Sequence, residues 1–181
     1  DWLFMLDEVQ TGNGRTGKYF AYQHSSVKPD VLTTAKGLGN GFPVGACMVS
    51  GRAKGLFTAG SHGSTYGGTP LVSRIVCTVY EALTEEVLGN AAKQGQAIKD
   101  AIINKYGDKG ITTRGLGMMI GIVMPDGVDC SRLVDIARDR HQLIINVTGG
   151  NVIRLLPALN ISVDDTNTLI EKLTTLLDEV L

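Results

Sequence analysis

The sequence has few cysteines and few histidines, and their placement limits what kind of protein it can be. Its three cysteines, Cys47, Cys77 and Cys130, include no CxxC pair. A disulfide framework or a zinc ribbon is therefore not expected. The three histidines lie far apart in the sequence, and none has the spacing of metal ligands. We expect no metal site.

An excess of charge of either sign is also lacking. Seventeen basic residues stand against 18 acidic ones, which gives a formal net charge of -1, and there is no basic tract. This balance argues against nucleic acid or an anionic membrane as the main partner. The apolar runs are far shorter than a membrane span, and no signal peptide opens the chain. We expect a cytoplasmic protein.

The beginning of the sequence has no Met and is apolar from its second residue, WLFML. Such a start suggests that the chain begins inside a buried strand, so we expect a fragment or a truncated product. Its 181 residues are enough to bury a core and correspond to one or two domains.

Glycine is what the sequence has in excess. It contributes 23 of 181 residues, about 13%, against an average near 7% in soluble proteins. Many of these glycines fall in four clusters, TGNGRTG, KGLGNG, GSHGSTYGG and RGLGMMIG. The clusters indicate loops that need positive φ angles or a close approach of the backbone to a ligand.

The first half of the chain has the pattern of alternating strands and loops that ends in a helix. An apolar run at 2–7 predicts a strand buried on both faces, as in the middle of a parallel sheet. Further strands are expected at 29–35 and 44–50. Helical spacing from Thr69 to about Leu88 places four apolar residues on one face: Leu71, Ile75, Val79 and Ala82.

The character of the sequence changes near residue 88, where we place a domain boundary. Residues 1–88 are expected to form an α/β unit and residues 89–181 a small α+β unit. In the latter we expect helices at 91–107 and 131–141 and strands at 115–124, 143–147 and 151–159. Ser162 and Asp165 predict a capping box for a last helix, which carries an apolar stripe: Leu169, Ile170, Leu173, Leu176, Leu177 and Val180.

Lys36 is the first candidate for chemistry. It lies between an apolar run and the glycine-rich turn KGLGNGFP, with no other charge within several residues. A lysine that attacks a carbonyl carbon must be unprotonated, which burial and nearby positive charge promote. The alternative is a solvated lysine at the end of a strand.

Asp7 is the second candidate, at the carboxyl end of the predicted strand 2–7, where open α/β sheets place ligands. A buried carboxylate here could keep the ring nitrogen of pyridoxal 5'-phosphate (PLP) protonated. Val9 could pack against the ring and Gln10 could reach its hydroxyl, whereas Glu8 points to the other face and is expected to be structural. The alternative for Asp7 is an aspartate that turns a loop.

Two further places could bind anions. Ser64 and Thr65, in GSHGSTYGG, precede the predicted helix, and a helix start is a site for phosphate or carboxylate. Arg154 is a charge within the otherwise apolar stretch NVIRLLPAL, where it could hold a substrate carboxylate with two hydrogen bonds. A salt bridge to a protein carboxylate is an equal alternative for Arg154.

In this order, DEVQTGNGRTG, AKGLGNGFPVGA, GSHGSTYGG and RLLPALNIS resemble the class III (ω-) aminotransferases of PLP fold type I. The resemblance covers essentially the whole chain and is greatest to the acetylornithine branch. It implies the C-terminal part of such an enzyme, with an incomplete large α/β domain at 1–88 and the small α+β C-terminal domain at 89–181. One departure is Thr69, where the family usually has Asn.

The resemblance gives cofactor roles to six residues. It makes Lys36 the lysine that binds PLP and moves protons, and Asp7 the partner of the ring nitrogen. Val9 and Gln10 would lie against the ring and near its hydroxyl, and Glu8 belongs to the same stretch. Thr65 would bind the cofactor phosphate of the neighbouring subunit in a homodimer.

The resemblance also implies the substrates. Ser64 and Arg154 would face an amino acid or oxo acid, and the expected reaction converts acetylornithine and 2-oxoglutarate to a semialdehyde and glutamate, in arginine biosynthesis. Succinylornithine, ornithine or 4-aminobutyrate aminotransferase activity remains open, as does an aminomutase or decarboxylase on the same scaffold.

The resemblance places other parts of the site before residue 1. These are a glycine-rich phosphate loop, an aromatic residue on the second ring face and a second substrate arginine. We therefore expect the chain alone to bind PLP weakly, to be inactive and to self-associate through uncovered apolar surface. A folded, non-catalytic module for assembly is the alternative from another functional class.

Overall fold

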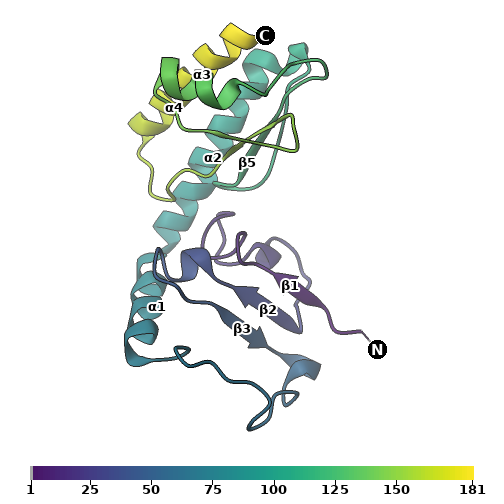
Figure 1. The fold of residues 1–181 in the computed structure, drawn as a ribbon, viewed down its shortest axis with the longest axis vertical. Helices are drawn as coiled ribbons and strands as arrows, with labels where there is room; N and C mark the ends of the chain where they lie inside the picture. The colour runs from purple at the N-terminus through teal and green to yellow at the C-terminus, as the bar shows by residue number, and fades with distance from the viewer. Residues whose placement is uncertain (1) are drawn as a thin grey trace. The chain divides into compact units, whose positions relative to one another are not determined.

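The computed structural model describes residues 2–181, and the chain divides into two compact units, residues 1–88 and 89–181. The first unit contains a three-stranded sheet of β1 (Met5–Asp7), β2 (Val31–Thr34) and β3 (Ala46–Val49). Strand β2 lies in the middle, parallel to β1 and antiparallel to β3 (Figure 1). All three predicted strands are present, and each is shorter than its apolar run.

Short turns of 3-10 helix connect these strands. Helix η1 (Ala21–His24) lies between β1 and β2, η2 (Lys36–Leu38) follows β2, and η3 (Gly51–Ala53) follows β3. Helix η2 begins at the candidate lysine itself. The glycine-rich segment after β2 is therefore a tight turn that brings the chain back for the antiparallel strand.

The helix predicted from 69 to 88 is interrupted. Helix α1 (Pro70–Ala82) ends where Leu83 adopts a non-helical backbone conformation, and α2 (Glu85–Tyr106) begins three residues after α1 ends. Of the four apolar residues expected on one face of α1, Ile75 and Val79 are partly buried, whereas Leu71 is 63% exposed and Ala82 is exposed. The buried residue of the helix is Val72, which periodicity alone did not reveal.

The second unit is built on an antiparallel sheet with the order β4-β5-β7-β6. Its elements after α2 are η4 (Gly107–Lys109), β4 (Thr112–Arg114), β5 (Ile120–Val123), α3 (Leu133–His141), β6 (Asn146–Thr148), β7 (Val152–Leu155) and α4 (Val163–Val180). The sequence predicted all of these except η4 and β4. Strand β4 is the polar tripeptide TTR, which has no apolar pattern to reveal it.

The core of this unit lies between its helices and one face of its sheet. Helix α4 begins as predicted, because Asp165 N donates to Ser162 Oγ over 3.0 Å. Its apolar stripe contributes three fully buried leucines, Leu173, Leu176 and Leu177, while Leu169, Ile170 and Val180 pack partly buried against them. The predicted stripe is confirmed.

None of the helices within residues 2–181 combines the length and the apolar composition needed to cross a lipid bilayer.

Candidate functional site

Asp7 and Lys36 lie at the same edge of the first sheet. Asp7 is the last residue of β1, and its Cα partner in the neighbouring parallel strand is Thr33. Strand β2 ends at Thr34, and Lys36 follows after one intervening residue. Because parallel strands place their carboxyl ends together, the two candidate residues come to one edge, where α/β sheets bind ligands.

The backbone at Lys36 is held in an unusual conformation. Its φ angle is +48°, in the left-handed region that non-glycine residues seldom occupy. A residue in this region persists only where its surroundings fix it. Here the buried side chain of Asn13 does so: its Nδ2 donates to Thr34 Oγ1 over 2.8 Å and to the carbonyl oxygen of Ala35 over 3.1 Å. Asn13 thereby fixes the two residues that precede the lysine.

Asn13 was missed as a site residue in the sequence reading. Its position in the cluster TGNGRTG is a weak signal for the left-handed conformation it adopts, with φ at +55°. Its partners are 21 and 22 residues away, so no local pattern could reveal the contact. Its Oδ1 is buried and has no hydrogen-bond partner among residues 2–181.

Lys36 is exposed and lines a hollow of about 460 Å³ together with Arg15 and the turn residues 37 and 40–44. Arg15 is a second residue that the sequence reading missed. Burial lowers the pKa of its guanidinium below the ordinary value, and at neutral pH it remains a cation.

The turn after Lys36 requires glycine at position 39. A Cβ atom there would lie 2.1 Å from the carbonyl oxygen of Phe42, a distance that no side chain could tolerate. Close packing of the backbone therefore explains Gly39, whereas Gly41 has open space around it and a positive φ of +106°.

The carboxylate of Asp7 is held in place but is not buried. Its Oδ1 accepts hydrogen bonds from Thr33 Oγ1 and from the backbone N–H of Val9, both over 3.1 Å. The sequence predicted a buried carboxylate, and in this chain the residue is exposed. The reason is that β1 is an edge strand of its sheet, with β2 on one side only.

Of the three residues after Asp7, Glu8 has a structural role, and Val9 and Gln10 lie in the turn that follows. Glu8 is 3% exposed, and its carboxylate accepts from the backbone N–H groups of Ala21 (2.5 Å) and Tyr22 (2.8 Å) at the start of η1. This arrangement satisfies the free N–H groups of that helical turn and agrees with a structural role. Val9 and Gln10 are partly buried in the turn that follows β1.

Ser64 and Thr65 are exposed in the loop that precedes helix α1, as the sequence predicted. Helix α1 begins only at Pro70. Ser64 Oγ accepts from the backbone N–H of Gly67 over 3.0 Å, which closes a local turn. The role of the two residues as ligands of a phosphate or carboxylate stays a prediction.

Arg154 belongs to the second unit, in strand β7. It is partly buried, and within residues 2–181 it makes no ion pair with a protein carboxylate. Its Nε is buried and finds no hydrogen-bond partner in the described part of the chain. The alternative reading of Arg154 as half of an internal salt bridge therefore does not hold in this structure.

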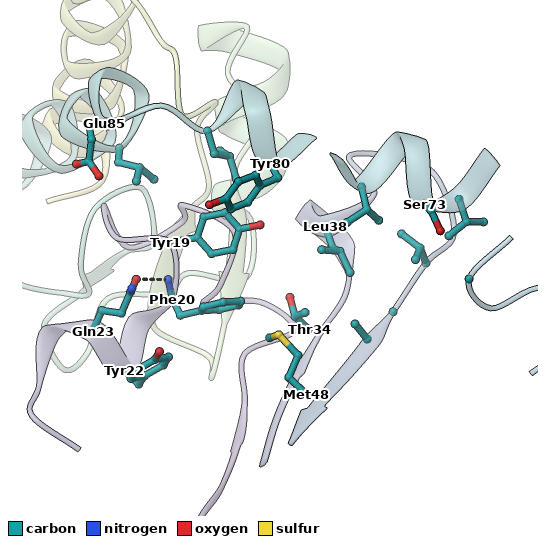
Figure 2. Close-up of a pocket in the computed structure, with 18 residues that line it drawn as sticks. Tyr19, Phe20, Tyr22, Gln23, Thr34, Leu38, Met48, Ser73, Tyr80 and Glu85 are labelled. Atoms are coloured by element: carbon teal, nitrogen blue, oxygen red, sulfur yellow. Dashed lines mark hydrogen bonds between the residues drawn. The ribbon is translucent and has the colours of Figure 1, made fainter. Parts of the chain in front are cut away.

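A larger hollow of the first unit lies elsewhere, with a volume of about 920 Å³. Figure 2 shows the aromatic residues that line it, among them Tyr19 and Tyr80. The centroids of these two rings are 5.3 Å apart. The backbone N–H of Phe20 donates to Gln23 Oε1 over 2.8 Å. Its lining contains none of the residues predicted for the site. Its lining is mostly apolar, and the polar groups in it include the Glu85 carboxylate, the Ser73 hydroxyl and the tyrosine hydroxyls.

Comparison with known proteins identifies the family. The model of the family Aminotransferase class-III matches residues 1–177. The chain belongs to the class III aminotransferases. It is 48% identical over 163 residues to the acetylornithine aminotransferase of Nitrosomonas europaea, an alignment that covers 88% of this chain and 40% of that enzyme.

Solved structures of this class have the same fold. The N-acetylornithine aminotransferase of Stenotrophomonas maltophilia superposes with a TM-score of 0.83 at 29% identity, over 98% of this chain and 47% of that one. The ornithine aminotransferase of Toxoplasma gondii superposes with a TM-score of 0.88 at 28% identity, over 98% of this chain and 43% of that one. The structure of that enzyme reveals partial occupancy of PLP at its active site.

These matches confirm the resemblance to the class III aminotransferases and the predicted fold class. The fold is that of part of a PLP fold type I aminotransferase, and class III aminotransferases depend on PLP. The chain spans less than half of the length of these relatives.

Proposed function

We propose that this chain is the part of a PLP-dependent acetylornithine aminotransferase that carries the cofactor lysine, Lys36. The observation that supports this most directly is the placement of Lys36 and Asp7 at the ends of two neighbouring parallel strands. The residue that precedes Lys36 in this turn, Ala35, is held by a hydrogen bond from the side chain of Asn13. The names of relatives such as the Nitrosomonas europaea enzyme favour acetylornithine as the amino donor.

The polar atoms that such a cofactor would need are available. Within residues 2–181, Lys36 Nζ makes no hydrogen bond or ion pair, and Asp7 Oδ2 accepts no hydrogen bond while Oδ1 is fixed by two. One oxygen of Asp7 thus orients the carboxylate, and the other can accept from a protonated ring nitrogen. When bound, PLP supplies a cationic ring that takes up electron density from the carbon atom losing its proton.

The residues of the chain have distinct tasks in this proposal. The amino group of Lys36 binds the cofactor aldehyde and then moves the proton of the substrate, which requires its neutral form. Arg15 lines the same hollow as Lys36. Asp7 holds the proton on the ring nitrogen, Val9 packs against the ring, and Gln10 lies near its hydroxyl.

Two loop residues and one strand residue complete the proposal. Thr65 has an exposed side chain that is free to contact another chain, and we assign it to the cofactor phosphate of the neighbouring subunit in a homodimer. Ser64 and Arg154 face the substrate, and 2-oxoglutarate is the amino acceptor. Residues 1–88 then correspond to the C-terminal part of the large PLP-binding domain, and residues 89–181 to the small domain.

The cofactor assignment is tested by covalent labelling. The chain is incubated with PLP, reduced with borohydride and digested, and the labelled peptides are mapped by mass spectrometry. We expect the label on Lys36, its loss in Lys36→Arg, and its persistence in the control Lys54→Arg, which removes another exposed lysine of the same unit. Label spread evenly over the exposed lysines would support the non-catalytic module instead.

The substrate assignment needs an intact enzyme. In a chimera, this chain replaces the matching stretch of the Nitrosomonas europaea acetylornithine aminotransferase. We expect N-acetylornithine to be transaminated faster than ornithine or 4-aminobutyrate, and Lys36→Ala to abolish the reaction. A chimera that prefers ornithine would contradict the substrate and leave the class intact.

A further inference from the structure

One row of residues crosses the second sheet from strand to strand. Arg114 in β4 is the Cα partner of Gly121 in β5, and Gly121 is in turn the partner of Arg154 in β7. Residues directly opposite each other in an antiparallel sheet project from the same face. Two arginines therefore stand on one face with a single glycine between them.

The glycine leaves room for the arginine side chain beside it. A Cβ atom at Gly121 would lie 3.1 Å from Arg114 Cγ, 3.5 Å from Arg114 Nε and 3.3 Å from Val152 Cγ1. The stem of Arg114 thus lies over Gly121 and leans toward the strand of Arg154. Both arginines line one hollow of about 330 Å³, whose other walls are mainly backbone and apolar side chains.

The charge in this hollow is not compensated by the protein. Its lining contains no carboxylate, and within residues 2–181 neither Arg114 nor Arg154 is in an ion pair. Arg154 Nε is moreover buried without an acceptor. A buried donor without a partner costs free energy. An anion bound between the two side chains would supply Arg154 Nε with an acceptor.

We propose that Arg114 is a second binding residue beside Arg154, and that the two guanidinium groups together hold one carboxylate group of a ligand. Guanidinium groups match the planar geometry of a carboxylate and bind it through paired hydrogen bonds. The proposal rests on the proposed function where it takes that ligand to be the amino-acid or oxo-acid substrate. Gly121 is then required as the gap through which Arg114 reaches the ligand.

The test follows the side-chain Nε–H signals of Arg114 and Arg154 by NMR in the labelled chain. Acetate is titrated at constant ionic strength, with chloride as the comparison anion. We expect both signals to shift with one common dissociation constant for acetate. Arg114→Gln should weaken that binding by about tenfold, because one charge-assisted contact is lost. Arg132→Gln, which removes an exposed arginine outside the hollow, should leave it unchanged.

Other outcomes would overturn the proposal. They are a shift of the Arg154 Nε–H signal alone on addition of acetate, an acetate dissociation constant that is unchanged in Arg114→Gln, or shifts with chloride that equal those with acetate. A thermal unfolding curve confirms that each variant is folded. Arg114→Lys serves as a second variant, which keeps the positive charge but lacks the planar guanidinium group. Labelling of Lys36 by PLP involves the first unit only, so its failure and a failure of acetate binding can be told apart.

Discussion

The side-chain amide of Asn13 donates to the carbonyl oxygen of Ala35 over 3.1 Å, and so fixes the residue immediately before Lys36. The same Nδ2 also donates to Thr34 Oγ1. The lysine therefore receives its left-handed backbone conformation from a loop that is distant in sequence. This relationship makes Asn13 a positioning residue for the proposed cofactor lysine.

Replacement of Asn13 should weaken both stability and the reaction of Lys36. Asn13→Gly keeps the left-handed backbone and removes both hydrogen bonds, so we expect a loss of about 1–3 kcal/mol in the free energy of unfolding. Asn13→Ala should cost more, because alanine is strained at positive φ. Urea unfolding measures the first effect, and the rate of PLP labelling at Lys36 measures the second. Wild-type labelling in a folded Asn13→Gly would contradict the positioning role.

Glu8 supports the same site from the other side of strand β1. Its buried carboxylate accepts from two backbone N–H groups of η1. Glu8→Gln keeps one acceptor oxygen and removes the charge, and we expect the free energy of unfolding to fall by about 2 kcal/mol. Glu81→Gln is the matched control, since Glu81 is exposed and its ion pair with Arg74 spans 4.0 Å. If Glu81→Gln lowered the free energy of unfolding as much as Glu8→Gln does, the stabilising role of the buried Glu8 carboxylate would be contradicted.

The parts of this fold that the sequence predicted are those with a local signal. Apolar runs mark the positions of β1, β2 and β3, and the capping pair Ser162 and Asp165 marks the start of α4. Lys36 and Asp7 follow directly from such runs, because each lies just at or after the end of a strand. Their meeting at one sheet edge then follows from the parallel pairing of β1 and β2.

The parts that could not be predicted depend on contacts between distant residues. Asn13 acts on residues that only folding brings near it, and β4 has no apolar pattern because its residues are polar. The burial of Val72 in α1 was not predicted because Leu71 and Val72 are equally apolar, and only packing shows that Val72 is the buried one. The pairing of Arg114 with Arg154 likewise requires the register of three strands.

Stability of the second unit should depend on pH through Asp178. Its carboxylate accepts from Lys105 Nζ over 2.8 Å and from Tyr106 Oη over 2.9 Å, and these hydrogen bonds lower the pKa of Asp178 below its ordinary value of 3.8. A carboxyl pKa that is lower in the folded state contributes stability above the ordinary value. That contribution is lost as the pH falls through the folded pKa.

The measurement is the free energy of unfolding in urea at about pH 7 and about pH 3, on either side of the ordinary pKa of an aspartate. Asp178→Asn should lower stability at the higher pH and reduce the difference between the two values. Asp126→Asn, in an exposed loop of the same unit, should leave the difference unchanged. An equal difference in wild type and Asp178→Asn would refute the assignment.

The exposure of Asp7, Lys36 and Thr65 has a consequence for activity. Water screens the attraction between an exposed carboxylate and a ring proton, so Asp7 in this setting favours the cationic ring only weakly. We expect the 181-residue chain to accept the PLP label at Lys36 at high cofactor concentration, yet to produce no detectable glutamate from N-acetylornithine and 2-oxoglutarate. The chimera with the Nitrosomonas europaea enzyme is the positive control. Turnover by the chain alone, abolished in Lys36→Ala, would show that the exposed site is already sufficient.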